Sequence, residues 1–499
     1  MKAAIQAVSV LAGILGAAAM PAYGQYANIY VQSDYNAANT GIGQGANVND
    51  GGSYNTAGGL AAMLDNSSGT YNTALGYEAL YHGVSPTYNT AVGDFALGIT
   101  NGSYNTGVGY QAMLQNDTGS YNTAVGSNAL YNNAVDDNTA VGFNALYTNT
   151  TGTLNTAVGF QAMYTNNGAY NTATGYSAMY ANASGSFNAA FGAITLQSNT
   201  TGGANTALGN SALQANTTGS NNTATGSNAL FLNVTGSANT ADGENALENN
   251  TSSSNSAFGF QALETNTSGT GNTAAGYNAL FGNSSGAYNI AVGYGAGANL
   301  TTGSDNIYVG NPGGTATESG KIRIGTHGTH TGVYLAGVYS AALTTDSPRP
   351  VYINGVGQLG YQPSAERYKT DVATMGDATS RLEELRPVTF RLKNDATRTV
   401  QYGLIAEEVA KVYPELVMRN ENGQIEGVRY EELAPMLLNE LQAQKRKNAE
   451  LQSQLAALGR QMQQLAQAQE MQQQQVAALH EQVRGARLTQ ASLTERPGL

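Results

Sequence analysis

The chain has 499 residues, a formal net charge of −12, and neither Cys nor Trp. Without Cys it can form no disulfide framework, so stability outside a cell would have to come from packing and assembly. After Lys2, the next Lys or Arg is Lys321. Because Lys and Arg bind phosphate backbones and anionic lipids, we expect the long middle section to bind neither nucleic acid nor a membrane surface.

Residues 1–24 have the features of a secretory signal peptide. Lys2 supplies a positive start, an apolar run follows from about Val8 to Met20, and the small residues Ala22 and Gly24 fit a cleavage site. The run is short for a membrane span, and an uncleaved N-terminal helix is the alternative. No later apolar stretch is long enough to cross a bilayer. We therefore expect a mature chain that is secreted or lies at the cell surface, without membrane insertion.

Residues 25–302 consist of a repeat that reads roughly Tyr-Asn-Thr-Ala-x-Gly-x-x-Ala-Leu, followed by a turn rich in Gly, Asn, Ser and Thr. Successive copies are 16 or 17 residues apart, which excludes the common helical repeats of about 33–47 residues. The repeated Asn occurs at Asn39, Asn55, Asn72, Asn89, Asn105, Asn122, Asn138, Asn155, Asn171, Asn188, Asn205, Asn222, Asn239, Asn255, Asn272, Asn289 and Asn306.

Two short strands and two turns would use about 16 residues, so each unit predicts one coil of a parallel β-roll or β-helix. Stacked coils would place equivalent residues about 4.8 Å apart. The repeated Asn would then form a hydrogen-bonded ladder, and pairs such as Ala129 and Leu130 would form an apolar stripe. One coil buries little apolar surface, and this gain is small compared with the cost of ordering the backbone, which is about 1–2 kcal/mol per residue. Lateral packing of several chains would therefore add stability.

The repeat resembles the head repeats of trimeric autotransporter adhesins, in which three β-rolls pack side by side. This resemblance implies a trimeric, mainly β fibre with a structural or adhesive role. The Tyr residues that precede many of the repeated Asn predict either a structural ladder or a carbohydrate-binding strip for surface glycans or a host receptor. We interpret Asn-x-Thr triplets such as Asn216-Thr217-Thr218 as turn chemistry rather than as glycosylation sites.

Residues 303–363 predict a β-rich connector, since short strand-like runs such as 306–310, 321–325 and 351–354 alternate with Gly, Pro, Thr and Ser. His327 and His330 lie three residues apart in a Gly and Thr loop. A metal site needs more ligands than these two. We therefore expect no metal here and no cofactor anywhere in the chain.

From Gly357 onward the sequence contains four blocks in order: GQLGYQPSAERYKTDV, LEELRPVTFRLK, QYGLIAEEVAKVYPELV and VRYEELAPMLLNELQAQ. They resemble the intramolecular chaperone domain of endosialidases and related phage tail spikes and fibres, and the same domain in bacterial secreted tail-fibre-domain proteins. The resemblance covers about residues 307–441. It implies a small α/β chaperone domain, assigned to 364–433, that drives formation of a homotrimer and then cuts itself off.

The resemblance also implies a catalytic pair, because the family's Ser precedes its Lys by five residues and Ser364 and Lys369 match that spacing. The scissile bond would be Pro363–Ser364. A hydroxyl becomes a good nucleophile only when a base takes its proton, and a free Lys has a pKa near 10.4, so burial at a subunit interface would have to keep the amine neutral. The only enzymology expected is this intramolecular cut, with no external substrate. Glu407 and Glu408 are interpreted as part of a structural helix, since adjacent helical residues point apart.

Residues 434–485 predict a coiled coil, and residues 486–499 a disordered tail. Apolar and amide residues recur at alternating spacings of four and three, as in the seam of an oligomer. The seam consists of Leu437, Leu441, Gln444, Asn448, Leu451, Leu455, Leu458, Met462, Leu465, Gln469, Gln472, Val476, Leu479 and Val483.

Together these features predict a secreted trimeric fibre whose C-terminal domain drives assembly and then detaches before Ser364. Two alternatives remain open. The first is a carbohydrate-binding or depolymerising fibre of the tailspike type, which would need a pair of catalytic carboxylates. The second is an uncleaved surface protein that keeps the chaperone as a permanent trimerisation domain.

Overall fold

The computed structural model describes residues 31–34, 38–46, 51–335, 350–355, 357–420 and 422–492. The predicted signal peptide lies outside these residues. The chain divides into two compact units, one within Met1–Asp346 and Gly355–Gly357 and the other within Ser347–Asn354 and Gln358–Leu499. Each unit is described by itself.

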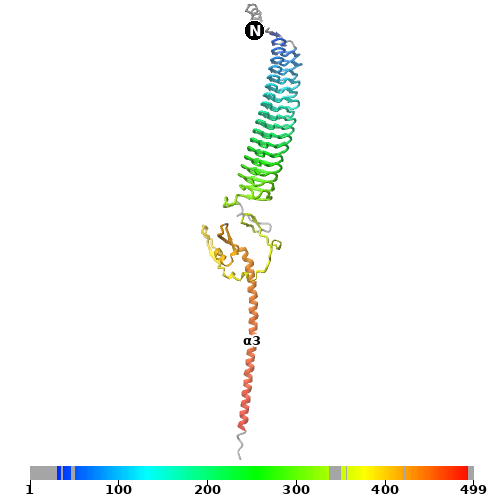
Figure 1. Cartoon of the computed structure of the whole chain (residues 1–499). Helices are drawn as coiled ribbons and strands as arrows, with labels where there is room; N and C mark the ends of the chain where they lie inside the picture. The colour runs from blue at the N-terminus through cyan, green and yellow to red at the C-terminus, as the bar shows by residue number, and fades with distance from the viewer. Residues whose placement is uncertain are drawn as a thin grey trace, which may run out of the picture. The chain divides into compact units, whose positions relative to one another are not determined.

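The first unit is a parallel β-solenoid, seen in Figure 1 as a regular stack of coils coloured from blue to green. In its main sheet β1 pairs with β2 in antiparallel orientation, and every later pairing is parallel, with strands one repeat apart in register. This confirms the predicted fold class. The 19 strands of this sheet are β1 (Val31–Asp34), β2 (Asn39–Ile42), β3 (Thr56–Gly58), β5 (Thr73–Leu75), β7 (Thr90–Val92), β9 (Thr106–Val108), β11 (Thr123–Val125), β13 (Thr139–Val141), β15 (Thr156–Val158), β16 (Thr172–Thr174), β17 (Ala189–Phe191), β18 (Thr206–Leu208), β19 (Thr223–Thr225), β20 (Thr240–Asp242), β21 (Ser256–Phe258), β22 (Thr273–Ala275), β23 (Ile290–Val292), β24 (Ile307–Val309) and β25 (Ile322–Ile324).

A second strand per coil forms only in part of the solenoid. There the second strands make a six-stranded parallel sheet, and in later coils the equivalent residues form turns. The prediction of two strands per coil is therefore correct for these coils and wrong for the later ones. The six strands are β4 (Asp65–Asn66), β6 (His82–Gly83), β8 (Ile99–Thr100), β10 (Gln115–Asn116), β12 (Asn132–Asn133) and β14 (Thr148–Asn149).

The solenoid core consists of small and medium apolar side chains together with asparagines. Ala124 at the centre of β11, and Ala129 and Leu130 after the next corner, are fully buried. The repeated Asn is buried too, and its side-chain oxygen accepts the backbone N–H of the Asn one coil later, at 3.0 Å from Asn222 to Asn205. The predicted apolar stripe and Asn ladder are thus confirmed.

Each coil turns at a glycine with a positive φ, for example Gly209 at +139°. A Cβ added there would lie 2.4 Å from the carbonyl oxygen of Gly226 in the next coil. Both the left-handed conformation and the close approach of the next coil require glycine. This explains why the repeat keeps Gly after its strand.

The stack continues past residue 302, where the sequence placed the start of a separate connector. β24 pairs in parallel with β23, and β25 pairs in parallel with β24. The predicted boundary is therefore wrong by at least one coil. At this end Tyr308 occupies the register position of Ala291 and is fully buried.

Glu318 links residues of the last coils around Tyr308 through hydrogen bonds. Its carboxylate accepts the Tyr308 hydroxyl at 2.9 Å and the Arg323 guanidinium at 2.7 Å. It also accepts the Gly314 N–H at 2.8 Å. Burial alone would raise the pKa of Glu318, but these donors outweigh it and lower the pKa to about 2.

The second unit is a small α/β assembly that ends in a long helix. Its hydrophobic core contains Val409, Tyr413, Leu416, Val417 and Val428. β28 pairs with β29 and β30 with β31, both antiparallel. The elements are β26 (Tyr352–Ile353), β27 (Leu359–Gly360), η2 (Glu366–Tyr368), η3 (Gly376–Thr379), η4 (Leu382–Glu384), β28 (Val388–Phe390), β29 (Gln401–Gly403), α2 (Ala406–Val412), η5 (Pro414–Leu416), β30 (Val417–Arg419), β31 (Ile425–Val428) and α3 (Tyr430–Ser492), where η marks a 3₁₀ helix.

α3, labelled in Figure 1, contains the whole predicted coiled-coil segment. It also runs on to Ser492, so residues 486–492, which were assigned to a disordered tail, are helical. The last seven residues lie outside the described part of the chain. None of the helices in the described ranges combines the length and hydropathy needed to cross a bilayer.

Candidate active site

Ser364 and Lys369, the predicted catalytic pair, lie close together. Lys369 Nζ donates to Ser364 Oγ at 3.3 Å. The backbone between them makes the contact possible, because η2 begins directly after Ala365 and Lys369 caps its end. The Tyr368 N–H bonds the Ala365 carbonyl at 3.0 Å, and the Lys369 N–H bonds the Glu366 carbonyl at 2.9 Å. A single tight turn therefore brings the fifth residue back to the serine.

In this arrangement the amine is the donor and the hydroxyl the acceptor. General-base catalysis needs the reverse, because a neutral amine must take the hydroxyl proton. Both side chains are exposed in the single chain, which leaves the amine in contact with water. The geometry supplies proximity, while desolvation would have to come from another chain.

The pair belongs to an exposed arm, defined as the described residues from 350 through 378, all of which are exposed. Proteins seldom leave so much apolar surface in water unless a partner covers it. The arm's exposed large apolar residues are Val351, Tyr352, Ile353, Leu359, Tyr361, Tyr368, Val372 and Met375.

Arg367 is a cationic residue two positions before Lys369. Its guanidinium carbon lies 4.8 Å from the centre of the Tyr368 ring, within the range of a cation–π contact. The tyrosine ring therefore helps to hold this cation in place beside the pair.

A polar junction fastens η3 to α3. The hydroxyl of Thr379, which is almost fully buried, donates to Glu440 at 2.8 Å and accepts the Asn439 amide at 2.6 Å. Asn439 also donates to the Gly376 carbonyl at 2.9 Å. No sequence motif marks these residues, because they are about 60 positions apart in the chain.

Glu407 and Glu408 lie in the first turn of α2, which confirms their assignment to a structural helix. Glu408 pairs with Arg386 at 2.6 Å. The hydrogen bond from Arg386 lowers the pKa of Glu408. This carboxylate is therefore held ionised in an ion pair and is poorly suited to acid catalysis.

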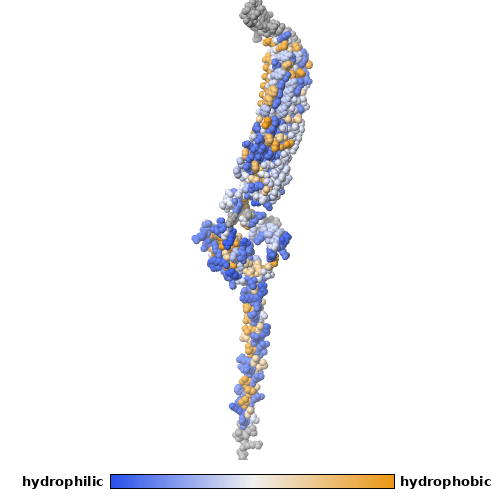
Figure 2. Space-filling model, viewed as in Figure 1, coloured by the Kyte–Doolittle hydropathy of each residue, from blue (hydrophilic) through white to orange (hydrophobic). Residues whose placement is uncertain are grey.

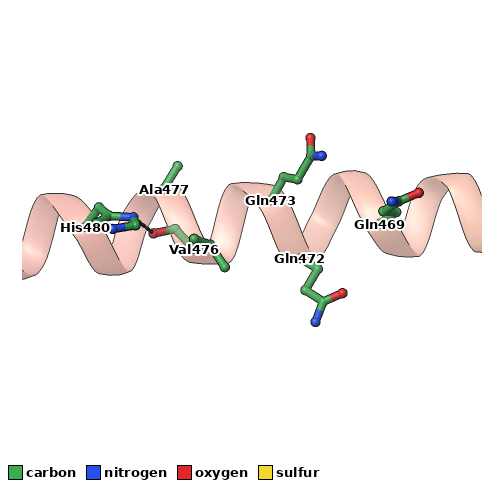
Figure 3. A pocket seen from close by; sticks show the side chains of 6 residues that line it. All are labelled: Gln469, Gln472, Gln473, Val476, Ala477 and His480. Atoms are coloured by element: carbon green, nitrogen blue, oxygen red, sulfur yellow. Dashed lines mark hydrogen bonds between the residues drawn. The ribbon is translucent and has the colours of Figure 1, made fainter.

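A shallow hollow along α3 is lined by residues of that helix alone. Gln472 and Gln473 point to opposite sides of the helix, and the imidazole of His480 approaches the Val476 carbonyl at 3.1 Å (Figure 3). These side chains do not converge on a ligand. Gln469, Gln472 and Val476 are also seam positions, so the hollow is part of the surface that a second helix would cover.

The apolar seam residues of α3 are exposed along the helix, and Figure 2 shows apolar residues in orange recurring along its length. Leu455 and Leu465, for example, are 67% and 70% exposed. A lone helix in water gains nothing from such a stripe. The pattern is typical of a helix that packs against copies of itself.

The tyrosines before the repeated Asn form stacked ladders on the solenoid. From Tyr54 to Tyr121, one ring per coil stacks on the next at 4.7–5.0 Å with nearly parallel planes. Stacking covers the ring faces that a sugar would need and leaves mainly edges and hydroxyls exposed. This geometry favours the interpretation as a structural ladder over a carbohydrate platform.

The acidic residues of the described chain do not gather into a metal site, since no three His, Cys, Asp or Glu side chains lie close enough to hold an ion. Within the solenoid, Glu248 and Glu264 occupy neighbouring coils. Burial, and then the charge of Glu248, raise the pKa of Glu264. A single carboxyl group with a raised pKa, without a defined pocket around it, does not form a hydrolytic site.

Residues 364–418 match the family described as chaperone of endosialidase. The matched segment begins at Ser364 and includes Lys369. No curated protein and no solved structure matched the chain. The chain thus contains a β-solenoid followed in sequence by a chaperone domain in the C-terminal unit, as in tail-fibre-like proteins.

Proposed function

We propose, taking the chaperone of endosialidase domain at residues 364–418 as the premise, that this chain is a secreted fibre protein that assembles as a homotrimer. The C-terminal unit gathers the chains, and then cleaves the Pro363–Ser364 bond. The mature product is the β-solenoid with its connector, and its work is structural or adhesive at the cell surface or outside the cell.

The observation that carries this proposal is the amount of apolar surface that the C-terminal unit leaves exposed. The arm and the α3 seam together expose large side chains such as Tyr361, Val372 and Leu455. Burying apolar surface stabilises by roughly 25 cal/mol per Å². Association of several chains through these two surfaces is therefore the favourable outcome, and the family match supports three of them.

Assembly also explains how the Ser364–Lys369 pair becomes reactive. When a neighbouring chain covers the arm, loss of water favours the neutral amine of Lys369. Ser364 Oγ then attacks the Pro363 carbonyl carbon while Lys369 Nζ takes the hydroxyl proton. The C–N bond breaks as that proton passes to the Ser364 nitrogen, which leaves an ester between Pro363 and Ser364 Oγ. Water hydrolyses the ester, and the products are a Pro363 carboxylate and a free Ser364 amine.

The experiment tests whether cutting depends on assembly. Leu455→Asp places a charge in the α3 seam, and Ala456→Asp places the same charge one residue outside it as the matched control. Light scattering gives the oligomeric state and gel electrophoresis gives the extent of cutting. We expect the control to be trimeric and cut, and Leu455→Asp to be monomeric and whole. A monomer that cuts at the wild-type rate would overturn the link between assembly and cleavage. A wild-type chain that never trimerises would overturn the proposed function.

A further inference from the structure

The main sheet of the solenoid has an outward face that runs the length of the stack. In each main-sheet strand from β3 to β24 the middle residue is buried and the first and third point outward, as in β13 and β15. The first positions form a row that is mostly threonine, with residues in register such as Thr123, Thr139 and Thr156. The third positions form a row that is mostly apolar. We call these two rows the sheet face.

The apolar row is well exposed in the single chain. Leu208 in β18 is 51% exposed, and its register neighbour Phe191 in β17 is 41% exposed. The large apolar members of the row that are exposed in β2 to β24 are Ile42, Leu75, Val125, Val141, Phe191, Leu208, Phe258, Val292 and Val309. A continuous apolar row of this length is the kind of surface that a partner covers.

Charge distinguishes the sheet face from the turns that carry most acidic residues of the solenoid. Among the outward positions of the main-sheet strands from β2 to β24, Asp242 is the one charged residue. The other acidic residues of these coils lie elsewhere, at Asp65, Glu78, Asp94, Asp117, Asp136, Asp137, Glu244, Glu248, Glu264 and Asp305. The solenoid offers no Lys or Arg to neutralise them before Lys321.

These observations indicate which face of the solenoid can pack against the solenoid of another copy of the chain. Any acid-bearing face would oppose acids of the neighbouring chain with no cation between them, and juxtaposed like charges are strongly unfavourable in a contact. The sheet face avoids this repulsion along nearly its whole length and buries apolar surface as well. We infer that the solenoids of the homotrimer pack on one another through the sheet face, with the acidic turns directed to solvent. This inference rests on the proposed trimer.

The test uses single cysteines, which give an unambiguous cross-link because the chain has no Cys of its own. All variants are made in the full-length Ser364→Ala chain, so that the C-terminal unit stays attached. Leu208→Cys reports the sheet face. Leu232→Cys is the matched control, a leucine of similar exposure (41%) in a turn outside that face. Leu455→Cys reports the α3 seam. Each protein is treated with an oxidant and, separately, with a short bismaleimide.

We expect efficient cross-linking at Leu455→Cys and at Leu208→Cys, with at least ~10-fold less at Leu232→Cys, because a disulfide requires Cβ atoms within about 4.5 Å. Cross-linking at Leu455→Cys without cross-linking at Leu208→Cys would overturn the sheet-face contact and leave the trimer intact. Cross-linking at Leu232→Cys in place of Leu208→Cys would assign the contact to another face. Failure at all three positions, with a monomeric mass, would overturn the proposed trimer and this inference together.

Discussion

Lys369 Nζ lies 3.3 Å from Ser364 Oγ, although the two residues are five positions apart in the chain. Lys369→Met keeps the length of the side chain and removes the base. We expect it to slow cleavage by at least ~100-fold, the usual contribution of a positioned general base, while trimer formation is unchanged. Lys393→Met, at another exposed lysine of the same unit, is the control. The rate at which fragments appear checks the prediction, and equal rates in the two variants would exclude Lys369 as the base.

The Asn ladder should be a main source of solenoid stability. Asn205 is fully buried, accepts the Asn222 N–H at 3.0 Å and donates to the Gly219 carbonyl at 2.9 Å. Asn205→Ala leaves the buried Asn222 N–H without this acceptor, at a cost of about 1–3 kcal/mol, while the Gly219 carbonyl keeps the Asn216 amide at 3.0 Å. We expect a lower thermal midpoint by circular dichroism. Asn210→Ala, at an exposed asparagine in the same coil, should leave the midpoint nearly unchanged.

The Glu318 cluster should make the C-terminal coils sensitive to acid. The pKa of Glu318 falls from an ordinary 4.5 to about 2. A group whose pKa is lowered on folding stabilises the fold above its unfolded value. Its contribution is therefore complete above about pH 4.5 and is lost as the pH falls towards 2. The contribution is at most about 3 kcal/mol, and water around Arg323, which is 40% exposed, reduces it.

Hydrogen exchange of the backbone amides of β24 and β25 between pH 2 and 6 measures this effect, because local opening reports the stability of a few coils. In Glu318→Gln we expect faster exchange at pH 6 and the loss of this part of the pH dependence. Glu244→Gln, at an exposed residue far along the stack, is the control. A pH dependence in Glu318→Gln that equals the wild type would contradict the assignment.

The junction between η3 and α3 should hold the C-terminal unit together. Thr379→Val has nearly the same shape but removes the hydroxyl that Glu440 and Asn439 share. Both partners then lose a buried contact, and we expect a loss of about 1–3 kcal/mol in the free energy of unfolding. Thr389→Val changes an exposed threonine of the same unit and should have little effect. Urea unfolding of the two variants makes the comparison, and equal midpoints would show that the junction is not structural.

The regular part of the solenoid could be predicted because each coil carries the same residue at the equivalent position. One Asn every 16 or 17 residues predicts a ladder, and Ala with Leu predicts a stripe. A second buried ladder was missed. Asn133 donates to Asn116 at 3.1 Å, and Asn149 donates to Asn133 at 3.0 Å. Asparagine in a turn is adequately explained by local turn chemistry, so only the recurrence of these residues at the repeat spacing could have revealed the ladder.

The ends of elements were harder to predict than their existence. The solenoid continues through β24 and β25, where Tyr308 and Glu318 take the places of the usual Ala and turn residues. The repeated sequence motif is no longer recognisable there, although the parallel strand pairing continues. α3 extends past Val483 because Ala, Arg, Leu and Gln beyond the last seam position favour a helix and outweigh Gly485. At the site, spacing and resemblance pointed to Ser364 and Lys369, whose side chains lie 3.3 Å apart, and their catalytic role stays a prediction. The exposure of the whole arm depends on the tertiary structure.

Self-cleavage before Ser364 is the central claim, and the intact mass of the assembled chain tests it most directly. Wild type and Ser364→Ala are purified in parallel, shown by light scattering to have the same oligomeric state, and measured by mass spectrometry. The account predicts that wild type yields the fragment Ser364–Leu499 and that Ser364→Ala stays whole. If both stay whole while trimeric, cleavage is contradicted, and the C-terminal unit is a permanent trimerisation domain.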